Sequence, residues 1–240
     1  MKNGVNVASG HTDLTTHLIS LHKEKPEFNS GWLRKMIVTN FGAGHETVAS
    51  TLTSIMAMLG THDDVARNLR EEIDQTAESR RFAVASRMPY AQAVIKECKR
   101  VHPVLAMALP RRVPQQGLVL HGYYFPPGTT VGCSPVSLHR NESICGPDPD
   151  AFNPQRWLDN ESRAKEMEVY SLAWGGGARS CPGRHLAELI VDKAVTALLA
   201  EFHVLADVPP DDEMPSYFLS MMTGVKARFI PRRSTGKVSL

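Results

Sequence analysis

The sequence predicts a mainly α-helical fold with small β elements, and three observations lead to that prediction. Apolar residues recur at helical spacing over long stretches, first within residues 12–101 and again within residues 183–202. Residues 117–125 read instead as a short pair of strands around a His-Gly turn. Residues 141–182 carry many Pro, Gly and Asp residues with little periodicity, and so long an irregular segment usually serves a ligand or a function.

Helices are expected over residues 12–23, 32–59, 61–79, 90–101 and 183–202. Gly60 ends the long second helix, and Thr61 with Asp64 resembles a capping box that opens the third. His102 should leave helical geometry because a proline follows it. Short strands are expected over residues 203–207, 217–222 and 225–230, with frayed ends at 1–11 and 232–240.

Composition, charge and cysteine spacing argue against several classes of protein. A net charge of +2, with no basic block interleaved with aromatics, argues against nucleic-acid binding. The N-terminus has no signal-peptide pattern, and residues 47–61, the longest uncharged run of the most apolar region, are too few to span a bilayer. Four cysteines without a C-x-x-C pair suggest neither a zinc knuckle nor a disulfide framework, and favour a reducing compartment.

The segment WGGGARSCPG, from Trp174 to Gly183, carries the strongest chemical signal. Its three glycines let the backbone approach a flat partner and adopt positive φ angles. Cys181 precedes Pro182, the expected first residue of a helix, where unpaired backbone N–H groups favour a thiolate. Arg179 can pair bidentately with a carboxylate. A lone cysteine is more often a buried apolar filler, but Gly, Arg and Cys at this fixed spacing favour a ligand site.

This segment resembles the cysteine loop of the cytochrome P450 family, whose pattern is F-x-x-G-x-R-x-C-x-G. The sequence matches that pattern at Gly177, Arg179, Cys181 and Gly183, and Trp174 stands where the family has Phe. The resemblance implies that Cys181 is the axial thiolate ligand of haem b, iron protoporphyrin IX. It also implies that Arg179 reaches a haem propionate, and that Trp174, Gly175 and Gly183 belong to the haem-binding loop.

Two further segments match the family's E-x-x-R helix and the arginine that joins it. Glu97 and Arg100 stand at i and i+3 of a predicted helix, where they share a face and can pair. Arg156, within FNPQRW, supplies the third member. By resemblance the three form a structural network. Taken alone, Glu97 and Arg100 would be an ordinary surface pair worth about 0–1 kcal/mol.

Residues 43–47, AGHET, lie in the middle of the long helix and are similar to the family's A-G-x-[DE]-T. A mid-helix glycine costs ~1 kcal/mol relative to alanine, so it needs a reason. The Thr47 hydroxyl can bond the Ala43 carbonyl and open the helix into a groove for dioxygen. The resemblance then makes Thr47 and Glu46 a catalytic proton relay. The alternative is close helix packing at the glycines, with an incidental acid.

Smaller matches complete the resemblance, which covers about residues 12–230. Arg111 lies where the family often has an arginine that reaches a propionate, and His139 and Arg140 correspond to a common pair before the irregular region. The resemblance implies that residues 1–240 are a partial haem domain, the C-terminal portion of the cytochrome P450 fold. Its parts are the oxygen-groove helix, the E-x-x-R helix, the irregular meander, the cysteine loop and the following helix.

The implied function is that of a haem-thiolate monooxygenase inserting one oxygen atom of O2 into a small lipophilic substrate. A flavin-containing NADPH reductase would supply electrons. Family members are longer and usually membrane-anchored, so relatives are expected at the endoplasmic reticulum membrane and this chain on the cytoplasmic side. Two alternatives stay open. One is a truncated, non-catalytic fragment that cannot retain haem. The other is a haem-thiolate sensor or electron-transfer protein, against which Thr47 and Glu46 argue.

Overall fold

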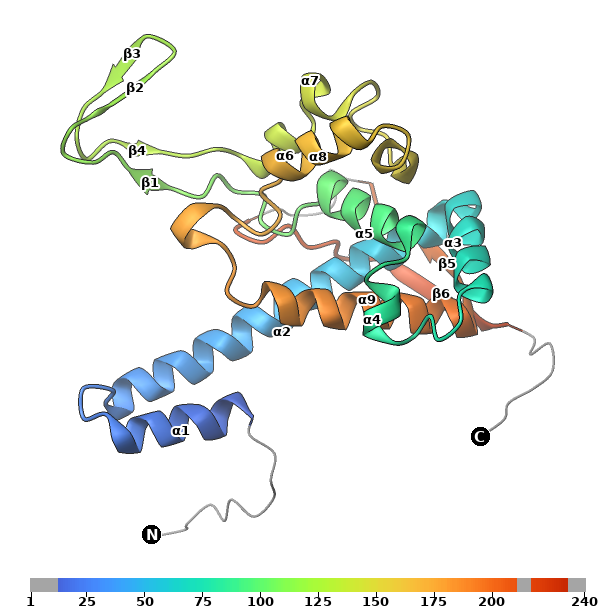
Figure 1. Ribbon diagram of the computed structural model, residues 1–240, viewed down its shortest axis with the longest axis horizontal. Helices are drawn as coiled ribbons and strands as arrows, with labels where there is room; N and C mark the ends of the chain where they lie inside the picture. Colours follow the sequence, from blue (N-terminus) through green and yellow to red (C-terminus); the bar gives the residue numbers. More distant parts are fainter. Residues whose placement is uncertain (1–12, 211–216, 233–240) are drawn as a thin grey trace. The chain divides into compact units, whose positions relative to one another are not determined.

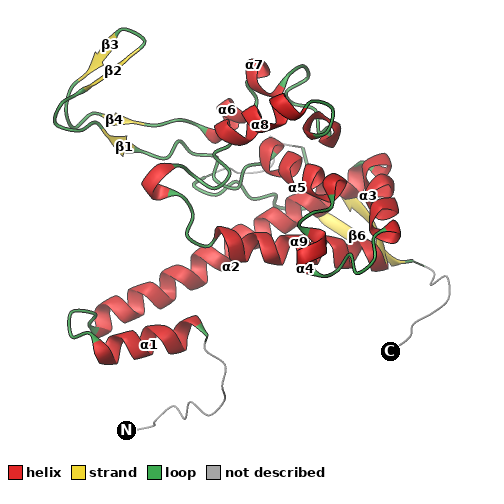
Figure 2. Ribbon diagram, in the orientation of Figure 1, coloured by secondary structure: helices red, strands yellow, loops and turns green. Residues whose placement is uncertain are grey.

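The computed structural model describes residues 13–210 and 217–232, in which helices dominate and the strands are short (Figures 1 and 2). The predicted mainly α fold with small β elements is confirmed. The chain divides into two compact units, residues 1–46 and residues 47–240. Within the described ranges, every helix is too short or too polar to cross a membrane.

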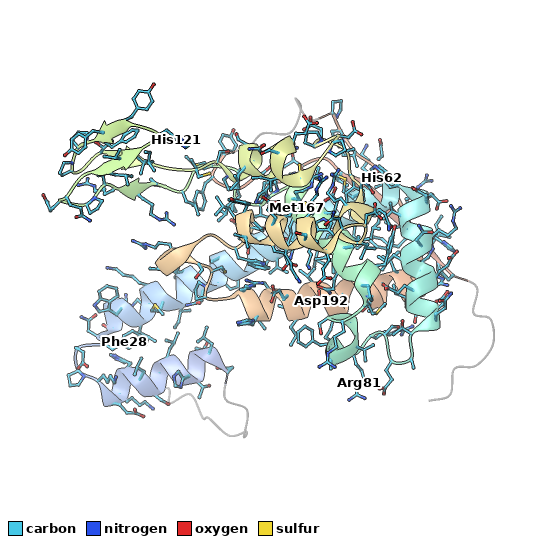
Figure 3. The ribbon with its side chains drawn as sticks, turned by 45° about the horizontal axis from the view of Figure 1, so that its top comes forward. Phe28, His62, Arg81, His121, Met167 and Asp192 are labelled. Carbon is cyan, nitrogen blue, oxygen red and sulfur yellow. The ribbon has the colours of Figure 1, made fainter. Side chains whose placement is uncertain are left out.

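The first unit contains α1 (Leu14–Glu24) and the N-terminal part of α2 (Ser30–Thr61). The Asp13 side chain caps α1 by accepting a hydrogen bond from the Thr16 N–H at 2.7 Å. α1 folds back beside the start of α2 in both views (Figures 1 and 3). This part of α2 exposes large apolar side chains: Trp32, Met36, Ile37, Val38 and Phe41.

The core of the second unit forms where the C-terminal part of α2 meets other helices. α3 (Asp63–Gln75) and α5 (Pro89–Val101) contact each other, and α9 (Arg184–Glu201) contacts both. The short α4 (Phe82–Ala85) also packs on α9. Fully buried side chains come from each long helix: Ile55, Leu59, Leu69, Val94, Val195 and Leu199. Burying one such side chain contributes about 1.5–3 kcal/mol, so this core holds α5 and α9 in place.

Among the described residues of the second unit, three two-stranded antiparallel sheets accompany the helices. β1 (Arg111–Arg112) pairs with β4 (Thr130–Val131), and β2 (Leu118–Leu120) pairs with β3 (Tyr123–Phe125). The predicted turn at His121 and Gly122 joins β2 and β3, with positive φ at both residues, as a two-residue hairpin requires. β5 (Phe202–Asp207) pairs with β6 (Lys226–Pro231). The predicted strand at residues 217–222 is wrong, because this segment holds only isolated bridge residues, Leu219 and Ser220, of which Leu219 pairs with Leu105.

The irregular region and the segment just before it, residues 135–182 together, are built from short helices, none of which periodicity predicts. They are α6 (Pro135–His139), α7 (Glu142–Cys145), η1 (Pro154–Trp157), α8 (Glu161–Tyr170) and η2 (Gly177–Arg179). The longest, α8, begins where the Asn160 side chain accepts a hydrogen bond from the Arg163 N–H at 2.9 Å. That capping residue is the signal from which α8 could have been predicted.

Two predicted helix ends are also wrong. Thr61 opens no new helix, because its hydroxyl donates to the Ala57 carbonyl at 2.9 Å and it remains in α2. α3 is instead capped by His62, without a side-chain hydrogen bond, and ends at Gln75. The expected frayed ends lie outside the described residues except for Arg232. Its guanidinium donates to the Leu199 carbonyl at 3.1 Å and pairs with Asp74.

Gly60 lies against the backbone of β5, and this contact gives a testable prediction. A Cβ at Gly60 would lie 2.5 Å from the Ala206 nitrogen, whereas one at Gly42 would meet nothing within 4 Å. We expect Gly60→Ala to lower the free energy of unfolding by about 1–3 kcal/mol through overpacking. Gly42→Ala, in the same helix, should leave it unchanged or raise it by up to about 1 kcal/mol. Chemical denaturation checks both, and equal effects would contradict the packing.

Candidate functional site

The glycine-rich loop before α9 is a closed turn. The Cys181 N–H donates to the Trp174 carbonyl at 2.8 Å, and the Gly175 N–H donates to the Leu172 carbonyl at 2.9 Å. Gly175 has φ +74° and Gly177 has φ +59°, conformations that residues with a Cβ rarely adopt. A Cβ at Gly175 would also lie only 3.0 Å from the Arg179 carbonyl oxygen. The turn that brings Cys181 back beside Trp174 therefore favours glycine at both positions, and most strongly at Gly175, where the Arg179 carbonyl leaves little room for a Cβ.

Cys181 presents an exposed thiol two residues before the N-cap of α9. The prediction that Pro182 is the first residue of this helix is wrong, because Gly183 is the N-cap and α9 begins at Arg184. The neighbouring surface is open, since a Cβ at Gly177 would meet nothing within 4 Å. The Arg179 guanidinium is exposed and makes no hydrogen bond or ion pair among the described residues. A flat, iron-centred group with carboxylates needs an accessible sulfur, a small-residue surface and a cation, so these residues fit a haem.

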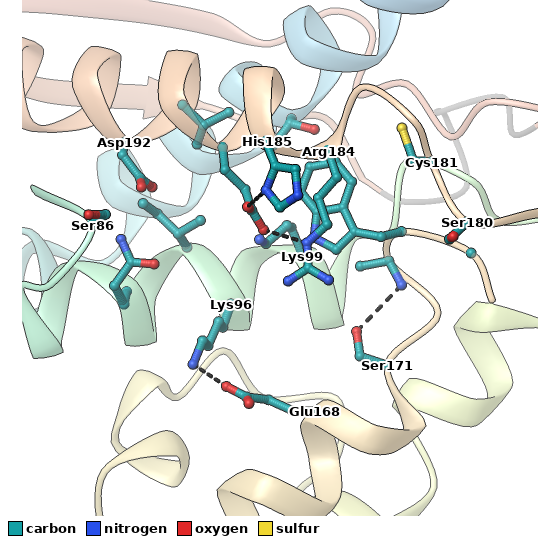
Figure 4. Close-up of a pocket in the computed structure, with 18 of the residues that line it drawn as sticks. Ser86, Lys96, Lys99, Glu168, Ser171, Ser180, Cys181, Arg184, His185 and Asp192 are labelled. Atoms are coloured by element: carbon teal, nitrogen blue, oxygen red, sulfur yellow. Dashed lines mark hydrogen bonds and ion pairs between the residues drawn. The ribbon is translucent and has the colours of Figure 1, made fainter. Parts of the chain in front are cut away.

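Trp174 is anchored from two helices. The Lys99 ammonium of α5 lies 5.0 Å from the centre of the indole ring, and the Arg184 guanidinium of α9 lies 5.8 Å from it. Glu188 accepts a hydrogen bond from Arg184 at 2.8 Å and holds that guanidinium (Figure 4). Burial lowers the pKa of Lys99, whereas the carboxylate of Glu188 opposes this shift. No sequence pattern predicts this stack, because its members are distant in the chain.

A cavity of about 1030 Å³ lies beside this stack. Its lining is strongly charged, with Lys96, Lys99, Lys165, Glu168, Arg184, Glu188 and Asp192 contributing (Figure 4). Cys181 also lines the cavity, but in Figure 4 its sulfur points away from the charged ends of Lys99 and Arg184. A largely apolar porphyrin ring would strand these charges, so the cavity is not where the ring fits. Of the predicted site residues only Trp174, Gly175 and Cys181 line it.

The structure brings Glu97, Arg100 and Arg156 together. The Glu97 side chain is 0% exposed, and Arg100 approaches it bidentately with two hydrogen bonds of 2.8 Å. Arg156 donates from Nε to the same carboxylate at 2.9 Å. Two further donors were not predicted, the Trp157 indole N–H and the Asn153 backbone N–H, each at 2.9 Å. Glu97 therefore accepts five hydrogen bonds, which is what a buried carboxylate requires.

The two arginines of this network also organise the irregular region. Arg100 donates to the carbonyls of His139 at 3.0 Å and Ala151 at 2.9 Å. Arg156 donates to the carbonyls of Cys145 at 2.8 Å and Asp148 at 3.1 Å. These carbonyls have no strand or long helix to pair with, so the guanidinium groups take the place of regular secondary structure.

The remaining predicted residues make none of the hydrogen bonds that the structure describes in this network. Thr47 is half-buried, and its carbonyl accepts a hydrogen bond from the Thr51 hydroxyl at 2.9 Å. A bond from the Thr47 hydroxyl to Ala43 stays a prediction. Glu46 is exposed and ends the first unit. Arg111 is exposed on β1 and donates only to nearby carbonyls, that of Pro110 at 3.1 Å among them.

The alternative of close packing at the mid-helix glycines finds no support among the described residues. A Cβ placed at Gly42 or at Gly44 would meet no heavy atom within 4 Å. The cost of a glycine at these positions is therefore not explained by a neighbour that needs the space.

Removing the Glu97 carboxylate should destabilise the fold strongly. Glu97→Ala leaves two buried guanidinium groups without their anion, which costs about 3–5 kcal/mol in the free energy of unfolding. Glu78→Ala is the matched control, because Glu78 pairs with Arg81 at the same i,i+3 spacing on the surface. That pair is worth about 0–1 kcal/mol. Chemical denaturation measures both variants, and a similar loss in each would show that burial of the network does not matter.

Comparison with known proteins agrees with this geometry. Residues 2–229 match the family model of cytochrome P450. The chain is 51% identical to "Cytochrome P450 monooxygenase sdnT" of Sordaria araneosa, over 92% of this chain and 43% of that protein. It is 40% identical to "Pisatin demethylase" of Fusarium vanettenii, over 69% of this chain and 33% of that protein. The chain thus spans less than half the length of either relative.

A comparison with a solved structure supports the same fold. A crystal structure of a cytochrome P450 superimposes with a TM-score of 0.78 at 24% sequence identity, over 95% of this chain and 52% of that one. At this identity the likeness concerns the fold, and the match to the family model carries the assignment. The chain belongs to the cytochrome P450 family.

Proposed function

We propose that this chain is the haem-binding part of a haem-thiolate monooxygenase that inserts one oxygen atom of O2 into a small lipophilic organic substrate. The observation that carries the proposal is the exposed Cys181 thiol on a closed glycine turn. That turn is anchored to α5 and α9 through Trp174. The names of the two relatives, a monooxygenase and a demethylase, support an oxidative reaction.

Each residue of the loop has a role in this proposal. Cys181 would be the thiolate ligand that holds haem b, and Arg179, with Arg111, would pair with its propionates. Trp174 and Gly175 would hold the loop beside the ligand, since the Trp174 carbonyl accepts the hydrogen bond of the Cys181 N–H. When bound, the haem supplies the reduction and cleavage of dioxygen. Gly183, the N-cap of α9, lies beside the sulfur, and a Cβ built on it would make an ordinary van der Waals contact with Sγ at 3.9 Å.

Thr47 and Glu46 are proposed to deliver protons. Glu46 is exposed to solvent and can collect a proton, and the neighbouring Thr47 hydroxyl can pass it on. The proposal further includes a flavin-containing NADPH reductase as electron donor. It places the chain on the cytoplasmic side, with full-length relatives anchored at the endoplasmic reticulum membrane.

A second candidate is a polypeptide that cannot retain haem by itself. The start of α2 favours it, because Trp32 is 54% exposed, Val38 70% and Phe41 76%. Exposed apolar area costs about 25 cal/mol per Å² of lost burial. We propose that these side chains are covered by the further length of chain that the relatives possess. A chain that lacked this cover would aggregate or bind haem weakly.

The absorption spectrum of the reduced, carbon monoxide-bound protein tests the function. We expect a thiolate-ligated band in the haem-loaded chain, its loss in Cys181→Ser, and its retention in Cys133→Ser. The second variant is the matched control, because Cys133 is also exposed but lies outside the glycine turn. An intact band in Cys181→Ser would exclude Cys181 as the ligand. No band in any of the three proteins would favour the second candidate.

The role of Thr47 is tested by the coupling of NADPH oxidation to product formation. We expect Thr47→Ala to keep its haem and still consume NADPH. Product per NADPH should fall several-fold, with peroxide rising in its place, because proton delivery is disturbed. Thr51→Ala, one turn further along α2, removes the same hydroxyl outside the A-G-x-[DE]-T segment and should stay coupled. Unchanged coupling in Thr47→Ala would show that the hydroxyl only packs the helix.

A further inference from the structure

His139, at the end of α6, is a buried side chain that the proposed chemistry does not use. It is only 6% exposed. Its Nε2 accepts a hydrogen bond from the backbone N–H of Leu172 at 2.9 Å. Because a backbone N–H can only donate, Nε2 must carry a lone pair, and the ring proton of the neutral imidazole resides on Nδ1. Leu172 stands two residues before Trp174 and accepts the Gly175 N–H, so this bond holds the entrance of the cysteine loop.

The backbone of His139 is joined to the buried charge network. Its carbonyl accepts a hydrogen bond from Nη1 of Arg100 at 3.0 Å, and Arg100 pairs bidentately with Glu97. The next residue fixes the same segment, since Arg140 donates to the Val101 carbonyl at 3.0 Å and pairs with Asp150 at 2.9 Å. His139 is therefore attached to α5 through its main chain and to the cysteine loop through its ring.

The surroundings keep the ring neutral and able to accept. Burial lowers the pKa of His139 to about 4, and the nearby charges of Arg100 and Arg140 act in the same direction, whereas backbone hydrogen bonding at Arg100 and Lys99 opposes the shift. The other ring nitrogen, Nδ1, is buried and makes no hydrogen bond of ordinary geometry among the described residues. The hydrogen bond that orients the ring is therefore the one that Nε2 accepts from Leu172.

We propose that His139 is a positioning residue for the thiolate ligand, and that its ring couples the Glu97–Arg100 network to the cysteine loop by holding the Leu172 amide. The inference concerns the same site as the proposed function and rests on Cys181 as the ligand. The hydrogen bond itself exists without haem, so it can be tested apart from ligation.

Substituting His139 by Gln or by Asn distinguishes the positioning role from a general requirement for a buried side chain. Both substitutions introduce a carboxamide group. Gln places its side-chain oxygen near the position of Nε2 and can accept from Leu172. Asn is one methylene shorter and reaches only the position of Nδ1. Both replace the imidazole by an amide of similar polarity, so a purely structural requirement for a buried ring would disturb both variants alike.

The first measurement is amide hydrogen exchange followed by mass spectrometry on the 240-residue chain. We expect exchange across residues 171–176 to rise about tenfold or more in His139→Asn and to stay near that of the unsubstituted chain in His139→Gln. Residues 89–101 of α5 serve as the internal control and should remain protected in both variants. Unchanged exchange at residues 171–176 in His139→Asn, with α5 protected, would overturn the proposal. Equal disturbance in Gln and Asn would overturn it as well.

The second measurement uses haem-loaded protein and the spectrum of the reduced, carbon monoxide-bound form. The fraction with the thiolate-ligated band should fall in His139→Asn and be rescued in His139→Gln. If the unsubstituted chain gives no such band, the proposed function fails while the exchange experiment still decides the His139–Leu172 bond. If exchange changes as expected but the band is equal in all three proteins, the bond exists without positioning the ligand, and the proposal is wrong.

Discussion

The buried carboxylate of Glu97 is the interaction on which the site-bearing part of this chain depends. An unpaired carboxylate in a protein interior costs several kcal/mol, and here the cost is offset by five donors from α5 and from residues 153–157. The two arginines that neutralise it have further guanidinium N–H groups that do not bond the carboxylate. They use these donors on backbone carbonyls between residues 139 and 151, a segment with little regular structure of its own. One buried charge thereby orders a Pro- and Gly-rich region that has few apolar side chains to bury.

The cysteine loop depends on the same helix in a second way. Trp174 is held between a lysine of α5 and an arginine of α9, and the backbone before it is held by the His139 ring. These contacts come from outside the loop, whose own glycines supply only the turn. A glycine turn cannot fix the position of Cys181 by itself, because glycine has the largest conformational freedom. The position of Cys181 is therefore set by its neighbours.

The sequence predicts the parts of this arrangement that rest on local chemistry. Periodicity located the long helices, and the His121–Gly122 pair located the hairpin, because both signals act over a few residues. The pairing of Glu97 with Arg100 followed from helix spacing, but that of Arg156 came only from family resemblance. The donors Trp157 and Asn153 were missed because nothing local relates them to α5. The position of Pro182 suggested too early a helix start, because Pro182 and Gly183 form a turn and α9 begins only at Arg184. The helix α8 was missed because its apolar periodicity is weak.

A double-mutant cycle on Glu97 and Arg156 tests whether the buried carboxylate and the guanidinium stabilise the chain as a coupled pair. The free energy of unfolding is measured for Glu97→Ala, Arg156→Ala and the double variant. If each single change strands a buried charge, the double variant should lose less than the sum of the two, by about 0.5–3 kcal/mol. Additive losses would contradict the account, because they would mean that the carboxylate and the guanidinium stabilise the chain independently.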